Sequence, residues 1–443
     1  MNDETTRGST GGGGVIDAVV IGAGVIGSAI ALELQRSGRR VLVVDKGGPV
    51  GGGSSSASSS IIRFNYSTLD GVIASWEAMH QWARWADHLG HVDGPLAQFH
   101  RIGMLVMLPP GDDQAVARGH LAAAGVPHEL LDPAALAARF PPIDGGCYHP
   151  PRWPTDPDFF SPAHGQVTAL YQPDAGFVDD PQLAARNLMD AARHLGAELR
   201  LRTEIVGVAT TAGRVSGVDL VDGTAIEAPV VVNAAGPWSS RLTALAGADR
   251  DLRIRCRPMR QTIASCLAPA GFRVDDGGAV MADMDLGAYG RPHPGGSFLI
   301  GGVEADCDPL EWVDDPDAGS PTPDPGMFEA LSYRMARRIP GLGVPHRPQG
   351  LASHYDVADD WTPIYDRSCV DGFYLAVGTS GNQFKNAPIV GEMMAHLIDA
   401  VEAGQAHDAD PVRMTCTHTG LELNLGQFSR LREPAATGGN VWG

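Results

Sequence analysis

The sequence predicts an α/β protein with a Rossmann-like dinucleotide-binding domain and a second domain. Two features of residues 17–46, DAVVIGAGVIGSAIALELQRSGRRVLVVDK, predict the first domain: a strand, a glycine-rich turn, a helix and a second strand follow one another, and an acid, Asp45, ends the second strand. The length predicts the second domain, because 443 residues exceed what one hydrophobic core usually organises.

The first strand and the glycine-rich turn have the pattern that a dinucleotide pyrophosphate requires. AVVIGAG is a short β-branched run, typical of a buried parallel strand. Gly22, Gly24 and Gly27 form G-x-G-x-x-G, in which the first glycine allows a tight turn, the second admits a phosphate and the third allows close helix packing. The following SAIALELQRSG is expected to be an amphipathic helix that ends at Gly38, with N–H groups at its N-terminus available to the phosphate.

The second strand and the segment after it leave two alternatives open. Asp45 lies about 20 residues past the glycines, where a carboxylate accepts hydrogen bonds from both ribose hydroxyls of an adenosine. The alternative is a buried βαβ unit that binds no ligand. The composition of residues 51–60, GGGSSSASSS, favours a linker, but its hydroxyl and N–H groups are also suited to line a pyrophosphate and a flavin.

Composition and charge exclude several classes of partner. The 33 Lys and Arg residues against 52 Asp and Glu residues give a net charge of −19, which repels nucleic acid and anionic lipid. No apolar run approaches the roughly 18 residues of a membrane span. The six cysteines contain no C-x-x-C pair, and Cys416 with His418 offers too few ligands, so no metal is expected. The polar leader, residues 1–14, lacks a secretory signal, so a reducing compartment, the cytoplasm, is expected.

Five later segments, in this order, resemble the D-amino-acid-oxidase-like superfamily of FAD-dependent amine oxidoreductases, and especially its sarcosine oxidase and dimethylglycine dehydrogenase branch. They are SIIRFNY, YQPDAGFVDDPQLAARNLMDAARHLGAEL, VVVNAAGPWSSRL, AYGRPHPGGSFLIGG and the closing YDVADDWTPIYD…GFYLAVGTSGNQFKNAPIVGEMMAHLI. The similarity runs from about Val15 to Asp399. It implies that FAD is the cofactor and that the C–N bond of an amino acid or N-alkyl amino acid is oxidised. A hydride passes to the flavin, the imine hydrolyses, and oxygen or a redox carrier accepts the electrons.

The resemblance and the composition breaks together predict the domain boundaries. The FAD-binding domain is expected to be discontinuous, over residues 15–90, 160–245 and 345–410. The substrate domain is expected over residues 91–159 and 246–344, as an antiparallel sheet with helices on one side. The acidic, proline-rich residues 314–326 are expected to form an exposed loop. The tail, residues 411–443, has no assigned position and either folds over the entrance or is partly disordered.

Small residues and one helix are expected beside the flavin. In VVVNAAGPW, a strand reaches Ala235 and Gly236, which let a flat ring pass close to the backbone; an ordinary turn is the alternative. A helix beginning near Ala387 or Pro388 would stabilise the negative charge on the reduced ring. The expected FAD-contacting residues are Gly22, Gly24, Val25, Ile26, Gly27, Asp45, Lys46, Ser54, Ser59, Ser60, Val206, Ala235, Gly236, Trp238, Gly378, Gly381, Asn382, Gln383 and Lys385.

Two cations match those that hold a substrate carboxylate in the sarcosine-oxidising relatives. They are Arg63 in SIIRFNY and Lys385 in GNQFK, and holding the carboxylate would leave the neighbouring C–N bond over flavin N5. The alternative for each is an ordinary surface charge. Tyr289 and Arg291 alternate on a predicted strand and therefore share one face, toward the substrate or toward solvent. His354 and Tyr355 are both candidate acceptors of a proton from the substrate ammonium group, and a structural hydrogen-bonding role is the alternative. The other candidates for shaping the pocket are Tyr66, His293, Glu304 and Tyr355.

Departures from the family pattern limit what the resemblance implies. Ser353 stands where some relatives attach FAD through a cysteine, and no histidine occurs between residues 46 and 79, so FAD is expected to be noncovalent. Ile300 aligns with a lysine that promotes reaction with oxygen, so a dehydrogenase is expected unless another cation, such as Arg291 or His293, takes its place. A flavin monooxygenase that uses NADPH and a non-catalytic flavoprotein subunit are the alternative functions.

Overall fold

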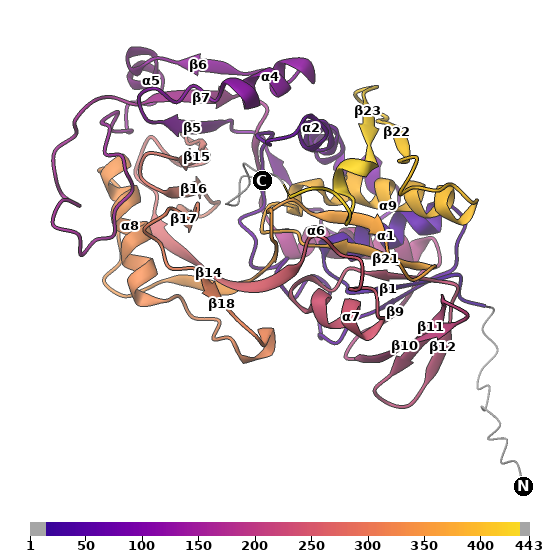
Figure 1. The fold of residues 1–443 in the computed structure, drawn as a ribbon. Helices are drawn as coiled ribbons and strands as arrows, with labels where there is room; N and C mark the ends of the chain where they lie inside the picture. The colour runs from indigo at the N-terminus through magenta and orange to yellow at the C-terminus, as the bar shows by residue number, and fades with distance from the viewer. Residues whose placement is uncertain (1–14, 435–443) are drawn as a thin grey trace, which may run out of the picture.

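The computed structural model describes residues 15–434, in which two large sheets lie side by side (Figure 1). The first is six-stranded, in the order β20-β21-β13-β1-β2-β9. Its strands are β1 (Ala18–Ile21), β2 (Val41–Val44), β9 (Glu198–Arg200), β13 (Val230–Asn233), β20 (Ile364–Arg367) and β21 (Phe373–Val377). β1 pairs in parallel with β2 and β13, and only β20 is antiparallel to its neighbour. Every residue of β1, β2 and β13 is buried, which explains their continuous apolar sequences.

The helix after the glycine turn is more enclosed than the sequence predicts. α1 (Val25–Arg36) ends just before Gly38, as expected, but nearly all its residues from Val25 to Leu34 are buried. The reason is that α6 (Pro181–His194) and α9 (Ala387–Glu402) both pack against α1. The predicted helix is therefore present, but segments distant in the sequence cover most of its surface.

The second sheet has the order β18-β14-β17-β16-β15-β5-β7-β6, with β19 also paired to β14. Its strands are β5 (Met104–Leu108), β6 (Glu129–Leu131), β7 (Thr168–Gln172), β14 (Cys256–Leu267), β15 (Val280–Asp283), β16 (Ala288–Pro292), β17 (Ser297–Gly302), β18 (Glu311–Trp312) and β19 (Gly350–Ala358). All pairs are antiparallel except β15 with β5. α5 (Pro133–Arg139) and α8 (Pro325–Arg338) pack on one face through an apolar cluster that includes Ile300 and Phe328. The predicted fold class, with an antiparallel second sheet, is confirmed.

Two strands lie in the second sheet although the predicted boundaries assign them to the FAD-binding segments. β7 pairs with β5, with Leu105 opposite Tyr171, and β19 follows β14 along its whole length. Backbone hydrogen bonding therefore extends the second sheet into residues 160–245 and 345–410. Two smaller three-stranded sheets are formed by β3 (Ile61–Ile62), β8 (Gly176–Val178) and β4 (Phe99–His100), and by β10 (Ile205–Thr211), β11 (Arg214–Leu220) and β12 (Ala225–Glu227). The remaining helices of residues 15–434 are α2 (Leu69–Ala83), α3 (Trp85–Leu89), α4 (Ala115–Ala123) and α7 (Ser239–Leu245).

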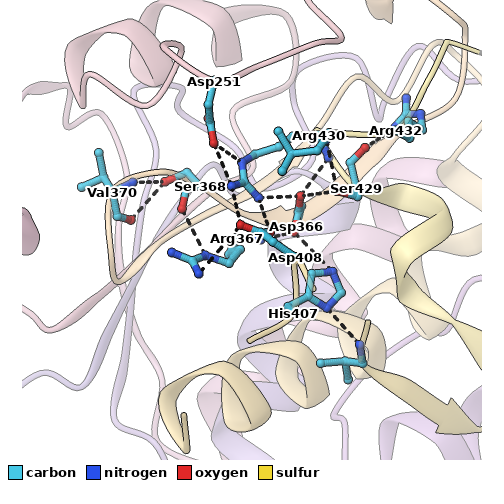
Figure 2. A network of polar contacts seen from close by, with 12 residues as sticks. Asp251, Asp366, Arg367, Ser368, Val370, His407, Asp408, Ser429, Arg430 and Arg432 are labelled. Carbon is cyan, nitrogen blue, oxygen red and sulfur yellow. Dashed lines mark hydrogen bonds and ion pairs between the residues drawn. The ribbon is translucent and has the colours of Figure 1, made fainter. Parts of the chain in front are cut away.

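The C-terminal segment is anchored by a buried ionic network (Figure 2). β22 (Arg413–Thr415) and β23 (Glu422–Asn424) form a hairpin, and the side chain of Arg430 beyond it is buried. Arg430 donates to Asp366 at 3.0 Å, to Asp408 at 2.8 Å and to Asp251 at 2.9 Å. Residues 411–434 therefore have a fixed place against the first sheet, where the sequence assigned none. Asp251 and Asp366, two of the carboxylates that Arg430 contacts, are distant from it in the sequence, so no local pattern predicts this network. The rest of the tail, residues 435–443, and the leader, residues 1–14, lie outside the described residues.

Candidate functional site

A cavity of about 1090 Å³ is lined by residues of both large sheets. It meets the carboxyl ends of β1, β2 and β13, which is where open parallel sheets bind ligands. Its lining is formed by the glycine turn, residues 44–61, the turn after β13, part of β19 and residues 379–385.

The glycine turn needs its glycines for measurable steric reasons. Gly22 has φ +110°, and a Cβ there would lie 2.4 Å from the carbonyl oxygen of Ala234. A Cβ on Gly27 would lie 1.9 Å from the carbonyl oxygen of Gly22. Gly27 therefore lets the helix pack on the turn and does not line the cavity, whereas Gly24, Val25 and Ile26 do. The turn and the first N–H groups of α1 fit a bound pyrophosphate.

Asp45 lies at the end of β2 and braces the glycine turn as well as facing the cavity. Its Oδ2 accepts a hydrogen bond from Ala23 N at 2.6 Å, and its Oδ1 accepts one from Gly47 N at 2.6 Å. The next residue, Lys46, pairs with Asp317 at 2.6 Å and lies 4.2 Å from the ring centroid of Trp238. This pair joins the predicted 314–326 loop to the edge of the cavity.

The serine-rich residues 51–60 form a wall of the cavity and not a free linker. Ser54 Oγ donates to the carbonyl oxygen of His354 at 2.7 Å, which attaches this segment to β19. Ser60 Oγ donates to the carbonyl oxygen of Val178 at 2.6 Å. Ser55, which sequence reasoning missed, accepts a hydrogen bond from Val25 N at 2.9 Å. Nothing local distinguishes it from its neighbours in a run of serines.

The remaining predicted cofactor residues, with one exception, also line the cavity. Val206, Ala235, Gly236, Trp238, Gly381, Asn382, Gln383 and Lys385 all contribute to its wall. Gly378 does not, because its N–H donates to Asp356 Oδ2 at 2.6 Å beneath the surface. A Cβ on Gly381 would lie 2.3 Å from the Tyr355 ring, so only glycine admits that ring. The helix predicted to begin near Ala387 or Pro388 is α9, which begins at Ala387.

Arg63 and Lys385 meet in the same buried region. Their exposed fractions are 6% and 2%, so the surface-charge alternative is wrong for both. The Arg63 guanidinium carbon lies 5.2 Å and the Lys385 Nζ 4.8 Å from the ring centroid of Tyr66. Lys385 donates to the carbonyl oxygen of Asn382 and Arg63 to that of Asn65. Burial and, secondly, the charge of Arg63 hold the pKa of Lys385 well below its ordinary value.

Tyr289 and Arg291 share one face of β16, but only Tyr289 reaches the cavity. Tyr289 Oη lies 3.2 Å from Ser59 Oγ and lines the wall. Arg291, with 1% exposed, donates through Nε to the carbonyl oxygen of Ser59 at 2.6 Å and lies 4.1 Å from the Phe177 centroid. The expectation that Arg291 faces the substrate is wrong, because its donors are used to hold the serine-rich segment. His293, the other suggested cation, is bound to Arg291 at 3.0 Å.

Two further expectations depend on the direction of a side chain in a strand. The ring of His354 faces away from Tyr355 and against Gly319, where a Cβ would lie 2.4 Å from its Cε1. Its backbone, by contrast, holds Ser54. Ile300 belongs to the apolar cluster under α8 and not to the cavity side. Alternation puts Leu299 and Gly301, and not Ile300, on the side of Tyr289.

The fold and this cavity define a flavin-binding α/β protein of the oxidoreductase class. The chain belongs to the DAO family, FAD dependent oxidoreductase, whose model matches residues 17–397. It is 27% identical over 414 residues to the peroxisomal sarcosine oxidase of Homo sapiens, covering 90% of this chain and 95% of that one. It is 24% identical over 420 residues to the FAD-dependent oxidoreductase domain-containing protein 1 of Bos taurus, covering 86% and 81%.

Solved structures show the same fold. L-proline dehydrogenase from P. horikoshii superimposes with a TM-score of 0.73 at 23% identity, over 94% of this chain and 97% of the other. Glycine oxidase from Geobacillus kaustophilus gives a TM-score of 0.71 at 21% identity, over 94% and 98%. The protein is therefore an FAD-dependent oxidoreductase, and the predicted cofactor, FAD, is confirmed.

Proposed function

We propose that the protein oxidises the C–N bond of an α-amino acid or N-alkyl amino acid of the sarcosine or dimethylglycine kind, and that water hydrolyses the resulting imine. The observation that carries this proposal is the pair of buried basic side chains, Arg63 and Lys385, beside one tyrosine ring at the cavity. Two basic side chains at one place in a cavity can form charge-assisted hydrogen bonds with a carboxylate, such as that of an amino acid substrate. The name of the human relative, sarcosine oxidase, agrees with this class.

Different residues of the cavity have different roles in the proposed reaction. FAD, when bound, accepts the hydride from the substrate carbon. The glycine turn and the N-terminus of α1 would hold its pyrophosphate, and Asp45 would hold its ribose. The N-terminal end of α9, preceded by residues 381–385, would stabilise negative charge on the flavin ring. Arg63 and Lys385 orient the substrate by its carboxylate.

The residues around the cavity support noncovalent attachment of FAD. Within residues 15–434 no cysteine lines the cavity, and Ser353 lines it at the position where relatives carry a cysteine. His354 is the one histidine in that described lining, and its ring lies against Gly319.

The electron acceptor and the compartment are parts of the same proposal. β17 presents Leu299 and Gly301, and no cation, on the side of Tyr289, which favours a dehydrogenase that passes electrons to a redox carrier. The described cysteines are all free, which is compatible with the cytoplasm. Within residues 15–434 no helix has the length and apolar character of a membrane span.

Anaerobic reduction of the flavin tests the proposal. The holoenzyme is expected to bleach with N-methyl amino acids in the absence of NADPH, and much more slowly with the decarboxylated amines. A charge-assisted hydrogen bond contributes roughly 1.5–3 kcal/mol, so Arg63→Met should lower the reduction rate by about ten- to a hundredfold. It should also lose the discrimination between acid and amine.

Other outcomes would contradict the proposal. Bleaching only with NADPH identifies a monooxygenase, and no bleaching with any amine identifies a non-catalytic subunit. Equal rates with an amino acid and its amine in the parent show that no carboxylate is held. Arg413→Met is the matched control, because Arg413 is exposed and pairs with Glu422 on the distant hairpin.

A further inference from the structure

An amino acid arrives at neutral pH with a proton on its nitrogen, and that proton must leave before the C–N bond can be oxidised. The nitrogen lone pair has to become available to form the imine, so a group in the cavity must accept the proton. The following inference rests on the proposed function, because it concerns the same substrate.

Lys385 has an environment that favours a neutral amine. Its Nζ is fully enclosed, donates to one backbone oxygen, that of Asn382, and faces the ring of Tyr66 at 4.8 Å. Its backbone is fixed because Trp82 Nε1 donates to the Lys385 carbonyl oxygen at 2.6 Å. Among the described residues no carboxylate forms an ion pair with Lys385, and the charge that acts on it is the like charge of Arg63.

Lys46 provides the contrast within the same cavity. Its Nζ contacts both carboxylate oxygens of Asp317, at 2.6 and 2.7 Å, and its side chain is one-third exposed. A lysine in those surroundings remains an ammonium ion. Lys46 and Lys385 are the only lysines in the sequence, so the two environments are directly comparable in one protein.

We propose that Lys385 is a neutral amine in the resting enzyme and accepts the proton from the substrate ammonium group. The N–H bond of the substrate breaks and its electron pair stays on the substrate nitrogen, while the Nζ lone pair forms the new N–H bond. Lys385 then carries the positive charge that holds the substrate carboxylate. Because the amine and the carboxylate are attached to the same carbon, one Nζ can contact both.

Other groups near the cavity are less suited to accept the proton. Burial raises the pKa of both Tyr289 and Tyr355, so their hydroxyls stay protonated. The ring of His354 lies against Gly319. Glu304 is the rival: its Oε1 accepts a hydrogen bond from Gln261 Nε2 at 3.1 Å, and its charge acts on Arg63.

The charge of Lys385 can be read directly by NMR. Holoenzyme labelled with ¹³Cε-lysine has two lysine signals, and Lys46→Arg assigns them. At pH 7 the Lys385 signal is expected at the position of a neutral amine and the Lys46 signal at that of an ammonium ion. An ammonium position for Lys385 in the ligand-free holoenzyme would overturn the proposal. This result does not depend on finding a substrate, so it is distinct from failure of the proposed function.

The pH dependence of flavin reduction tests the proton transfer. Lys385→Arg keeps a cation for the carboxylate but accepts no proton at accessible pH. Its substrate affinity should stay within a few-fold of the parent. Its limiting rate at pH 7 should fall at least about tenfold and recover about tenfold per pH unit, as the bound substrate loses its proton to solvent. A Lys385→Arg profile parallel to that of the parent, or this recovery in Glu304→Gln instead, would overturn the proposal.

Discussion

At the scale of single residues, Asp45 has two roles, one in the glycine turn and one at the cavity. Its carboxylate accepts two backbone N–H bonds that shape the glycine turn, and it lines the cavity where a ribose is expected. Asp45→Asn keeps one of the two acceptor oxygens for the turn and removes the charge. We expect a folded protein whose dissociation constant for FAD rises about tenfold, equivalent to ~1.4 kcal/mol, measured by fluorescence titration of the apoprotein.

Asp17→Asn is the matched control for this experiment. Asp17 also accepts a backbone N–H bond, from Arg40 at 2.8 Å, but it does not line the cavity. An unchanged FAD affinity in Asp45→Asn, or the same loss in Asp17→Asn, would contradict the role of Asp45.

The residues that the sequence predicted well are those in motifs with one steric solution. Gly22 and Gly27 could be assigned because a Cβ at either position would collide with backbone. Arg63 and Lys385 needed the resemblance, because isolated cations carry no sign of being buried. The surroundings of His354 and Ile300 were not predicted, because the direction of a side chain depends on strand register, which the sequence does not determine at one-residue precision. Arg291 lies on the predicted face but binds the carbonyl oxygen of Ser59.

At the scale of elements, three glutamates lie at the junction of α1, α2, α3 and α9. The pKa of one of them, Glu392, has a testable consequence for stability. Burial first, and then the charges of Glu33 and Glu77, raise the pKa of Glu392 to about 7. Glu33, His88 and Glu392 place potential metal-ligand atoms within 4.8 Å of one another, and Arg36 pairs with Glu33 at 2.5 Å.

The raised pKa predicts how stability depends on pH. The folded value of about 7 lies above the ordinary 4.5, so the protonated form is favoured in the folded state. The stability that the protonated Glu392 contributes is fully present below pH 4.5. As the pH rises to about 7 this contribution is lost, and the free energy of unfolding falls by at most ~3 kcal/mol. Glu392→Gln removes this loss. The difference in free energy of unfolding between the variant and the parent, measured in urea, should therefore grow in favour of the variant from pH 5 to pH 8.

A matched variant distinguishes this effect from a general effect of charge. Glu422→Gln alters an exposed glutamate on β23, and its stability should depend on pH in the same way as that of the parent. If Glu392→Gln differs from the parent by the same amount at pH 5 and pH 8, Glu392 does not titrate as expected.

Among the elements, strands and helices with strong local patterns were predicted, and their partners were not. β1, α1 and β2 follow directly from apolar runs and the glycine turn. The pairing of β7 with β5 and of β19 with β14 escaped prediction, because it joins segments far apart in the chain. The covering of α1 by α6 and α9 escaped prediction for the same reason.

At the scale of the whole molecule, the cavity wall is made of segments from nearly the whole described chain. Residues 21–26, 44–63, 202–206, 234–245, 351–355 and 376–385 contribute to it, and both sheets take part. Residues 411–434 line none of the cavity and pack near β20 and α2. A cofactor held by so many separate segments contributes to the stability of the entire fold.

Reversible removal of FAD is the test at this scale. Acid precipitation should release the yellow colour into the supernatant, because attachment is noncovalent. The apoprotein prepared under milder conditions should unfold at a lower temperature, and its midpoint should rise with the logarithm of the FAD concentration. The gain is about 2.7 kcal/mol at a hundred times the dissociation constant. Riboflavin, which lacks the pyrophosphate and the adenosine, should restore little of this gain, because the glycine turn and Asp45 would have nothing to bind. Colour retained in the acid pellet would contradict noncovalent binding, and a midpoint independent of FAD would contradict a cofactor shared by both sheets.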